Sequence, residues 1–106
     1  MLKAYDEKVV HLLKGRIQTI TPVKRVIVFG SRARGDAVEE SDLDVFIEME
    51  KLTPEIRRQL YDIAWEIGFE NDRVISLFLT TTLGLAEGLL SANPILKVIE
   101  REGVTV

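Results

Sequence analysis

A run of four apolar residues, Val26 to Phe29, constrains the fold most, because a strand without polar side chains must be covered on both of its faces. This run belongs to a predicted strand over 24–29, and further strands are predicted over 42–49 and 73–80, in "DLDVFIEM" and "RVISLFLT". Segments with apolar residues at helical spacing lie between and around them. Strands that alternate with helices predict a small α/β or α+β domain in which helices cover a sheet.

The clearest predicted helix lies in "LTPEIRRQLYDIAWEIG". Thr53 is suited to cap it, Pro54 to occupy its first turn and Gly68 to end it. Trp65 and Phe69 lie beside its apolar stripe, which assigns them to the core or to an interface. Further helices are predicted over 3–18, over 82–90 and in "NPILKVIEREG", where Asn93 is the cap, Pro94 the first helical residue and Gly103 the stop.

Length and composition limit the classes of protein to which the chain can belong. A chain of 106 residues predicts a single domain over 1–106, and 46% hydrophobic with 29% charged residues is typical of a soluble globular protein. The absence of cysteine excludes disulfides, thiolate zinc sites and thiol nucleophiles. One histidine excludes any site that needs two imidazoles from one chain. The net charge of -3 disfavours nucleic acid as a partner.

The sequence shows no membrane or export segment. No apolar run approaches the ~20 residues that are needed to cross a bilayer. The first residues, "MLKAYDEKVVHLL", mix charges into their apolar pattern, which a signal peptide does not. A cytoplasmic protein without membrane contact is the simplest interpretation of this pattern.

Two aspartates, Asp42 and Asp44, stand at the start of the second predicted strand. Residues i and i+2 of a strand point to the same face, so their Cα atoms lie ~6.6 Å apart and their carboxylates can converge. Neighbouring carboxylates repel, and one takes up a proton unless a cation relieves the repulsion. Mg²⁺ prefers oxygen ligands and is held by one or two carboxylates plus substrate phosphates. We therefore expect Asp42 and Asp44 to bind a metal ion; a solvated strand start is the structural alternative.

A Gly–Ser pair, Gly30 and Ser31, ends the first predicted strand. Glycine lets another group approach the backbone closely, and the free N–H groups of a helix that starts here favour an anion. The Ser31 hydroxyl adds a donor. Arg32 and Arg34 add positive charge, although solvated arginines are an equal alternative. If the two strands pair, this phosphate site faces the carboxylates, as a nucleoside triphosphate with bridging Mg²⁺ requires.

The stretch "GSRARGDAVEESDLDV" resembles the Gly-Ser…Asp-x-Asp signature of the DNA polymerase β-like nucleotidyltransferase superfamily. It is most similar to the minimal nucleotidyltransferases, which are small bacterial and archaeal members. The resemblance is strong over 26–48 and weaker over the rest of the chain. The matching residues are Gly30, Ser31, Arg34, Gly35, Ser41, Asp42, Leu43 and Asp44.

The resemblance implies a fold, a reaction and a partner. The fold is α/β, with a mixed sheet of three or more strands flanked by helices. The reaction is Mg²⁺-dependent transfer of a nucleoside monophosphate, AMP from ATP in particular, to an acceptor hydroxyl, with release of pyrophosphate. Small members are often paired with an all-helical HEPN protein (the higher eukaryotes and prokaryotes nucleotide-binding family) in toxin–antitoxin arrangements. This chain would be the antitoxin-like partner, which modifies the helical protein.

The third predicted strand departs from the superfamily pattern. Active members usually carry a third carboxylate there, whereas "VISLFLT" contains no acid and places Ser76 near the expected position. Glu48 shares a face with Asp42 and Asp44, but it lies ~13 Å along the strand from Asp44 by the usual rise, too far for one metal. Nucleotide or metal binding is therefore better supported than turnover.

The sequence leaves two functions open. One is the nucleotidyltransferase, and the other is an inactive antitoxin module that binds a nucleotide and a partner. A third function, an accessory domain that guides nucleic acid, is disfavoured by the negative net charge. The apolar segment "TTTLGLAEGLL", 80–90, is interpreted as a partner surface, because a chain this short covers its sheet poorly. The base, the acceptor and the oligomeric state, a homo-oligomer included, are left open.

Overall fold

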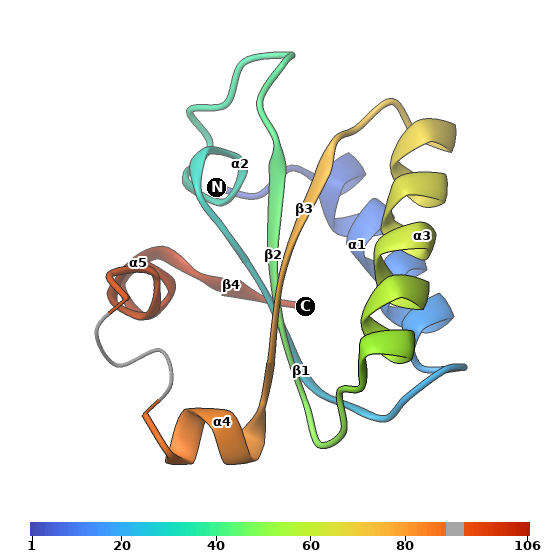
Figure 1. The fold of residues 1–106 in the computed structure, drawn as a ribbon. Coiled ribbons are helices and arrows are strands. Elements are labelled where there is room, and N and C mark those ends of the chain that lie inside the picture. The colour runs from blue at the N-terminus through green and yellow to red at the C-terminus, as the bar shows by residue number, and fades with distance from the viewer. Residues whose placement is uncertain (89–92) are drawn as a thin grey trace.

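A mixed sheet of four strands forms the centre of the part of the chain that the structure describes, residues 1–88 and 93–106 (Figure 1). The structure is a computed structural model. The strands are β1 (Val23–Phe29), β2 (Leu43–Met49), β3 (Ile75–Thr81) and β4 (Val104–Thr105), in the order β3-β2-β1-β4. β1 runs antiparallel to β2 and to β4, and β2 runs parallel to β3. The predicted α/β fold with a mixed sheet is confirmed.

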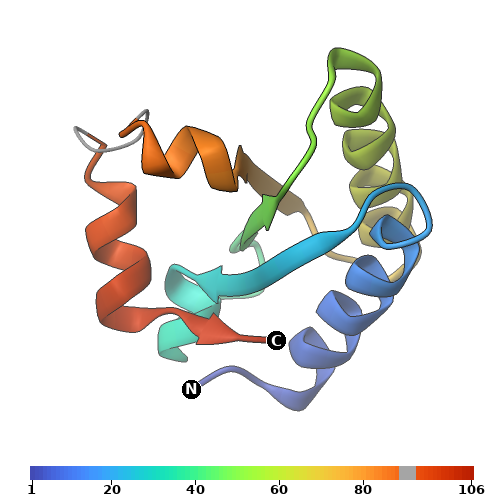
Figure 2. The same cartoon turned by 90° about the horizontal axis from the view of Figure 1, so that it is seen from below.

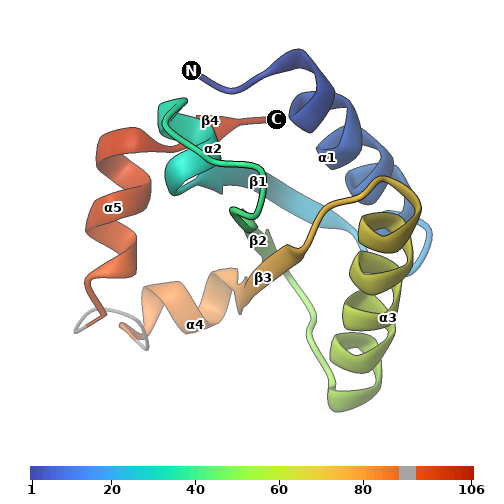
Figure 3. The same cartoon turned by 90° about the horizontal axis from the view of Figure 1, so that it is seen from above.

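Helices cover both faces of this sheet. On one face lie α1 (Ala4–Ile17) and α3 (Pro54–Glu70), and on the other lie α4 (Thr82–Ala86) and α5 (Ile95–Glu102) (Figure 2). The short α2 (Ser31–Arg34) follows β1 directly and sits beside the end of that strand (Figure 3). Within the described residues, none of these helices is both long enough and apolar enough to pass through a bilayer.

Two apolar clusters follow from the alternation of side chains along β2. Leu43, Val45 and Ile47 pack in the cluster under α1 and α3, whereas Phe46 packs in the cluster next to α5. Both faces of β2 are therefore covered, as the apolar composition of the central strands requires. The buried residues that α1 and α3 contribute to the first cluster are Val9, Val10, Leu13, Ile17, Leu60, Ile63, Ala64 and Ile67.

The capping signals of α3 and α5 act largely as predicted. The Thr53 hydroxyl accepts a backbone N–H from the first turn of α3 at 3.1 Å, and Pro54 begins that helix. The Asn93 side chain accepts the first N–H of α5 at 3.0 Å. Gly103 follows the last residue of α5, whereas Pro94 precedes the first helical residue instead of occupying that position.

The predicted end of α3 at Gly68 is wrong. The helix continues to Glu70, and Asn71 caps it. Gly68 is buried inside the last turns, where an added Cβ would overlap the carbonyl oxygen of Arg73. Glycine is thus required here by the close return of the chain into β3, and it does not end the helix.

The C-terminal third of the chain differs from the sequence interpretation in two places. α4 ends at Ala86, so the helix predicted over 82–90 is shorter, and residues 89–90 lie outside the described residues. β4 was not predicted. Val104 and Thr105 pair with Val28 and Ile27 of β1, and two residues are too few to show a strand period in sequence.

Candidate nucleotide and metal site

The end of β1 and the start of β2 meet at Gly30 and Asp44. The antiparallel register places Phe29 opposite Asp44, so the following Gly30 lies against the aspartate. Gly30 has a φ of 77°, and an added Cβ would overlap the Asp44 carboxylate. Both the backbone conformation and the close approach therefore demand glycine at this position. The expected close approach to Gly30 exists, and the protein group that makes it is Asp44.

The start of β3 completes this edge of the sheet. The parallel register pairs Asp44 with Ser76, and the Ser76 hydroxyl donates a hydrogen bond to Asp42 Oδ2 at 3.0 Å. Asp42 is exposed and Asp44 is half-buried. We call Asp42 and Asp44 the carboxylate pair. Ser76 occupies the place on β3 that the sequence analysis expected for it, directly beside this pair.

The electrostatics of the carboxylate pair favour a cation. Burial, and next the like charge of Asp42, raise the pKa of Asp44 above its ordinary value. The positive charge of Arg34 acts in the opposite direction and offsets only part of this effect. Within the described residues, no third histidine, cysteine or acidic side chain joins the pair to form a three-residue metal cluster. The pair thus supplies negatively charged oxygen ligands for a metal ion. Most coordination positions of that ion would be left to a substrate or to water.

The phosphate candidates Ser31 and Arg34 lie at the two ends of α2. The carbonyl of Ser31 accepts the N–H groups of Gly35 and Asp36, at 2.9 and 3.1 Å. Its own N–H lies in the first turn, where no intrahelical acceptor exists. Arg34 is exposed and donates to Asp36 at 3.1 Å and to Glu102 at 2.9 Å. Ser31 and Arg34 therefore stand at the surface beside the carboxylate pair.

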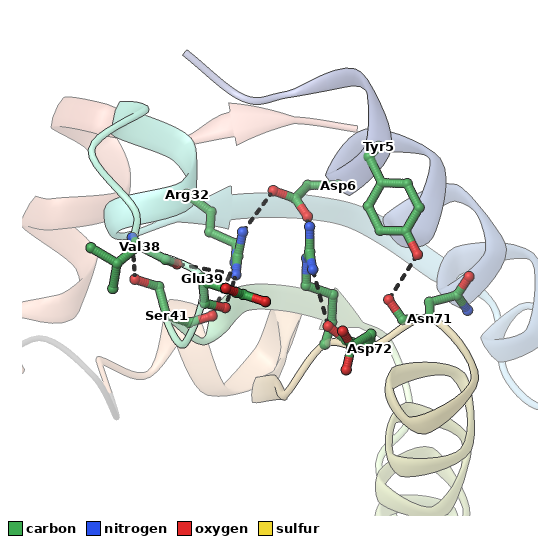
Figure 4. Close-up of polar contacts among 9 residues, drawn as sticks. Tyr5, Asp6, Arg32, Val38, Glu39, Ser41, Asn71 and Asp72 are labelled. Atoms are coloured by element: carbon green, nitrogen blue, oxygen red, sulfur yellow. Dashed lines mark hydrogen bonds and ion pairs between the residues drawn. The ribbon is translucent and has the colours of Figure 1, made fainter.

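Arg32 does not join this site. Its side chain is only 5% exposed, and Nη1 donates to Asp6 Oδ2 at 3.3 Å. Nε donates to the carbonyl of Ser41 and Nη2 to that of Glu39, both at 3.0 Å, and a longer bond of 3.4 Å reaches Val38 (Figure 4). A guanidinium whose donors are used in the interior is not positioned for phosphate. Instead, Arg32 fixes the loop that leads into Asp42.

Asp6 and Arg73 are the partners that sequence reasoning missed. Asp6 is 1% exposed and accepts hydrogen bonds from Arg32 and, at 2.7 Å, from Arg73 Nε. The Arg73 guanidinium also lies over the Tyr5 ring, 4.8 Å from its centroid. We call Asp6, Arg32 and Arg73 the arginine clamp. A signal was present, since Asp6 continues the helical spacing of the buried Val9 and the apolar positions that follow it.

Comparison with known proteins gives the family. Residues 10–82 match the family model described as nucleotidyltransferase domain. MJ0141 of Methanocaldococcus jannaschii, which is named as a candidate protein adenylyltransferase, is 34% identical over 77 residues, or 72% of each chain. The chain belongs to the nucleotidyltransferase domain family.

Solved structures support the same fold. A crystal structure of a toxin–antitoxin with AMP-PNP matches with a TM-score of 0.63 and 20% identity, over 94% of this chain and 70% of that one. A mutant of the toxin–antitoxin MntA–HpeT also matches with a TM-score of 0.63 and 20% identity, over 100% of this chain and 72% of that one. At this identity the similarity is one of fold.

Proposed function

We propose that the chain transfers AMP from ATP to a hydroxyl group of a partner protein, with Mg²⁺ held by Asp42 and Asp44. The carboxylate pair against Gly30 is the observation that carries this proposal, because it is a concentration of negative charge that the protein itself does not neutralise. The name of the archaeal relative and the AMP-PNP complex among the structural neighbours support adenylyl transfer and ATP. We further propose that this domain works in the cytoplasm.

The residues present fit a magnesium ion. The ligands at hand are carboxylate oxygens, and the Ser76 hydroxyl holds one of them in place. The pKa of Asp44 is raised first by burial and next by the like charge of Asp42, and a bound divalent cation would stabilise the ionised carboxylate against both. When bound, the metal would supply charge stabilisation for the attacking and leaving oxygens of the phosphoryl group. Gly30 and Ser31 would contact the triphosphate, and Arg34 would offset its charge.

Arg32 is left out of the proposed phosphate contacts. Its role in the reaction is indirect, because its bonds to the carbonyls of Glu39 and Ser41 hold the loop before Asp42. Arg34 must release Asp36 or Glu102 to turn toward a phosphate. The Arg34–Asp36 pair is exposed, and exposed ion pairs are weak, so the release of Asp36 costs little free energy.

The proposed reaction is a displacement at the α-phosphorus of ATP. The acceptor oxygen forms the new bond to phosphorus, and pyrophosphate leaves with the electron pair of the bond that breaks. The acceptor proton passes to solvent, because Ser76 is a neutral hydroxyl and a poor base where a carboxylate would be a good one. The chain therefore positions and stabilises the reactants and contributes little proton transfer.

The same serine favours a second candidate function. Ser76 pairs with Asp44 on β3, where the superfamily resemblance leads us to expect an acid. A chain that binds ATP and Mg²⁺ but turns over slowly would act as an antitoxin by contact alone. In both functions the partner is a helical protein of the HEPN type, an assignment that the toxin–antitoxin context of the structural neighbours supports.

One experiment separates these functions. The protein is incubated with Mg²⁺, ATP labelled at the α-phosphate and the purified product of the adjacent gene. Transfer of label to that product, and its loss in Asp44→Asn, supports the enzyme. The matched control is Glu50→Gln, which removes an exposed carboxylate just beyond β2 and leaves the pair intact. A stable complex without transferred label supports the contact antitoxin, and neither transfer nor complex contradicts both.

A further inference from the structure

Three aromatic side chains follow one line along the exterior of α3. Tyr61, Trp65 and Phe69 are four residues apart, and their side chains are 44%, 70% and 76% exposed. The Trp65 and Phe69 rings are stacked, with centroids 5.4 Å apart and an interplanar angle of 12°. Large aromatic side chains with this exposure mark an interaction surface more often than a bare protein surface.

These side chains form one wall of a groove of about 1100 Å³. The opposite wall is built by the loop before β2 and by the segment that leads from α3 into β3. Val74, 64% exposed, adds an apolar side chain to that wall. The loop wall consists of Glu39, Glu40 and Ser41, of which Figure 4 labels Glu39 and Ser41 near Asp72.

Carboxylates predominate among the charged residues that line the groove. Glu39, Glu40, Asp62 and Asp72 line it, and all four are exposed. The basic residue in its lining, Arg73, is already bound to Asp6 in the arginine clamp. A nucleotide or nucleic acid would be repelled here, whereas a cationic ligand is attracted both by the carboxylates and by the faces of the aromatic rings.

We propose that this aromatic–acidic groove binds a protein segment in which arginine side chains alternate with apolar ones. Arginine fits better than lysine, because its planar guanidinium stacks on an aromatic face while its N–H groups bond to carboxylates. Apolar side chains of the same segment contact Phe69 and Val74. The occupant is therefore a basic amphipathic segment of a partner protein.

The groove leads toward the carboxylate pair. Its lining residues Ser41 and Ile75 directly precede Asp42 and Ser76 in the chain. A segment bound in the groove is thus held near the edge of the sheet where the proposed transfer takes place. This last step rests on the proposed function, whereas binding of the segment does not.

Trp65 provides a direct test, because it is the one tryptophan in the sequence. The probe is a helical peptide with arginine at positions i and i+4 and leucine at i+3 and i+7, titrated into the full chain. The expected result is a saturable change in Trp65 fluorescence. The same peptide with glutamate in place of arginine produces no change, and one with serine in place of leucine binds at least about tenfold more weakly.

Variants of the protein locate the binding. Glu39→Gln with Glu40→Gln weakens binding of the arginine peptide and lowers its salt dependence. Phe69→Ala also weakens it, at least about tenfold by the scale of a lost buried apolar contact. The matched control Leu83→Ala, at an exposed apolar residue of α4 outside the groove lining, leaves binding unchanged. Equal binding of the arginine and glutamate peptides, or no saturable change with either, overturns the proposal.

Peptide binding in the groove and transfer of AMP can be tested independently. Asp44→Asn must keep peptide binding while it loses transfer, since Asp44 is not in the groove lining. If the wild-type chain binds the peptide but shows no transfer, the proposed transferase activity is refuted and the proposed binding role of the groove is supported. The groove proposal is refuted if no peptide binds and if transfer to the partner is unaffected by Phe69→Ala and by the paired glutamine variants. The proposed enzyme activity then still stands.

Discussion

Two acidic centres of this protein differ in how far their negative charge is compensated by neighbouring arginines. In the arginine clamp, Asp6 is 1% exposed and accepts hydrogen bonds from two guanidinium groups. In the carboxylate pair, Asp44 is half-buried and faces a second carboxylate, with Arg34 as a partial counter-charge. A buried charge that is paired and hydrogen-bonded belongs to the framework, whereas like charges left together have no structural benefit. The difference supports our proposal that Asp42 and Asp44 hold a ligand.

The sharpest contrast is expected when the framework acid is removed. Asp6→Asn leaves two arginines without their shared carboxylate, and Arg32 stays buried. We expect the free energy of unfolding to fall by about 3–5 kcal/mol, the scale for breaking a buried ion pair. Urea denaturation at neutral pH measures this loss. A fall below about 1 kcal/mol would show that the clamp does not stabilise the fold.

The two arginines of α2 provide the second contrast. Arg32→Lys keeps the charge but loses most of the hydrogen bonds to Asp6 and to the loop carbonyls, so we expect a loss of about 2 kcal/mol in stability. Arg34→Lys lies at the surface and should leave stability nearly unchanged while it weakens ATP binding. Thermal unfolding and ATP titration of both variants check this. Weaker ATP binding with unchanged stability in Arg32→Lys would instead indicate that Arg32 binds phosphate.

Glu48 tests a paired carboxylate on the same strand as Asp44. Burial acts to raise its pKa, but hydrogen bonds from Thr82 and Arg25 and the charge of Arg25 outweigh it, so the pKa lies below the ordinary 4.5. A lowered pKa contributes stability above the ordinary value, and this stability is lost as the pH falls through the folded-state pKa. We therefore expect Glu48→Gln to cost about 1 kcal/mol at neutral pH and progressively less in acid.

Unfolding free energies of wild type and Glu48→Gln from pH 7 downward give this dependence. The two curves should converge below the lowered pKa of Glu48. Curves that stay parallel across the acid range would mean that ionisation of Glu48 does not contribute, and that the variant acts by packing alone.

The sequence was sufficient to predict that Gly30 and Asp44 lie close together. It was not sufficient to predict that Arg32 is buried while Arg34 is exposed. Strands that follow one another in the chain, as β1 and β2 do across α2 and its loop, usually pair, and a strand period of two puts Asp42 and Asp44 on one face. The two arginines share one short helix and one local context. What distinguishes them is Asp6, 26 residues before Arg32. The helical spacing indicates that Asp6 is buried, but it does not indicate which arginine Asp6 contacts.

The same reasoning explains the other differences between sequence and structure. Gly68 has the composition of a helix end, but the carbonyl that requires a glycine belongs to the returning chain at Arg73. β4 takes its strand conformation from pairing with β1, and it is too short to carry a pattern of its own. Local signals predicted the elements, and contacts made outside each element decided these details.

The most direct test compares the stability of wild type and Asp44→Asn with and without Mg²⁺. Because burial and Asp42 raise the pKa of Asp44, its ionised form opposes folding at pH values above that raised pKa. Without metal, we expect Asp44→Asn to be more stable than wild type at neutral pH, by up to about 1 kcal/mol. Mg²⁺ with ATP should then raise the unfolding temperature of wild type and leave that of the variant unchanged. A variant that is less stable without metal, or one stabilised as much as wild type by Mg²⁺ and ATP, would contradict a ligand site at the carboxylate pair.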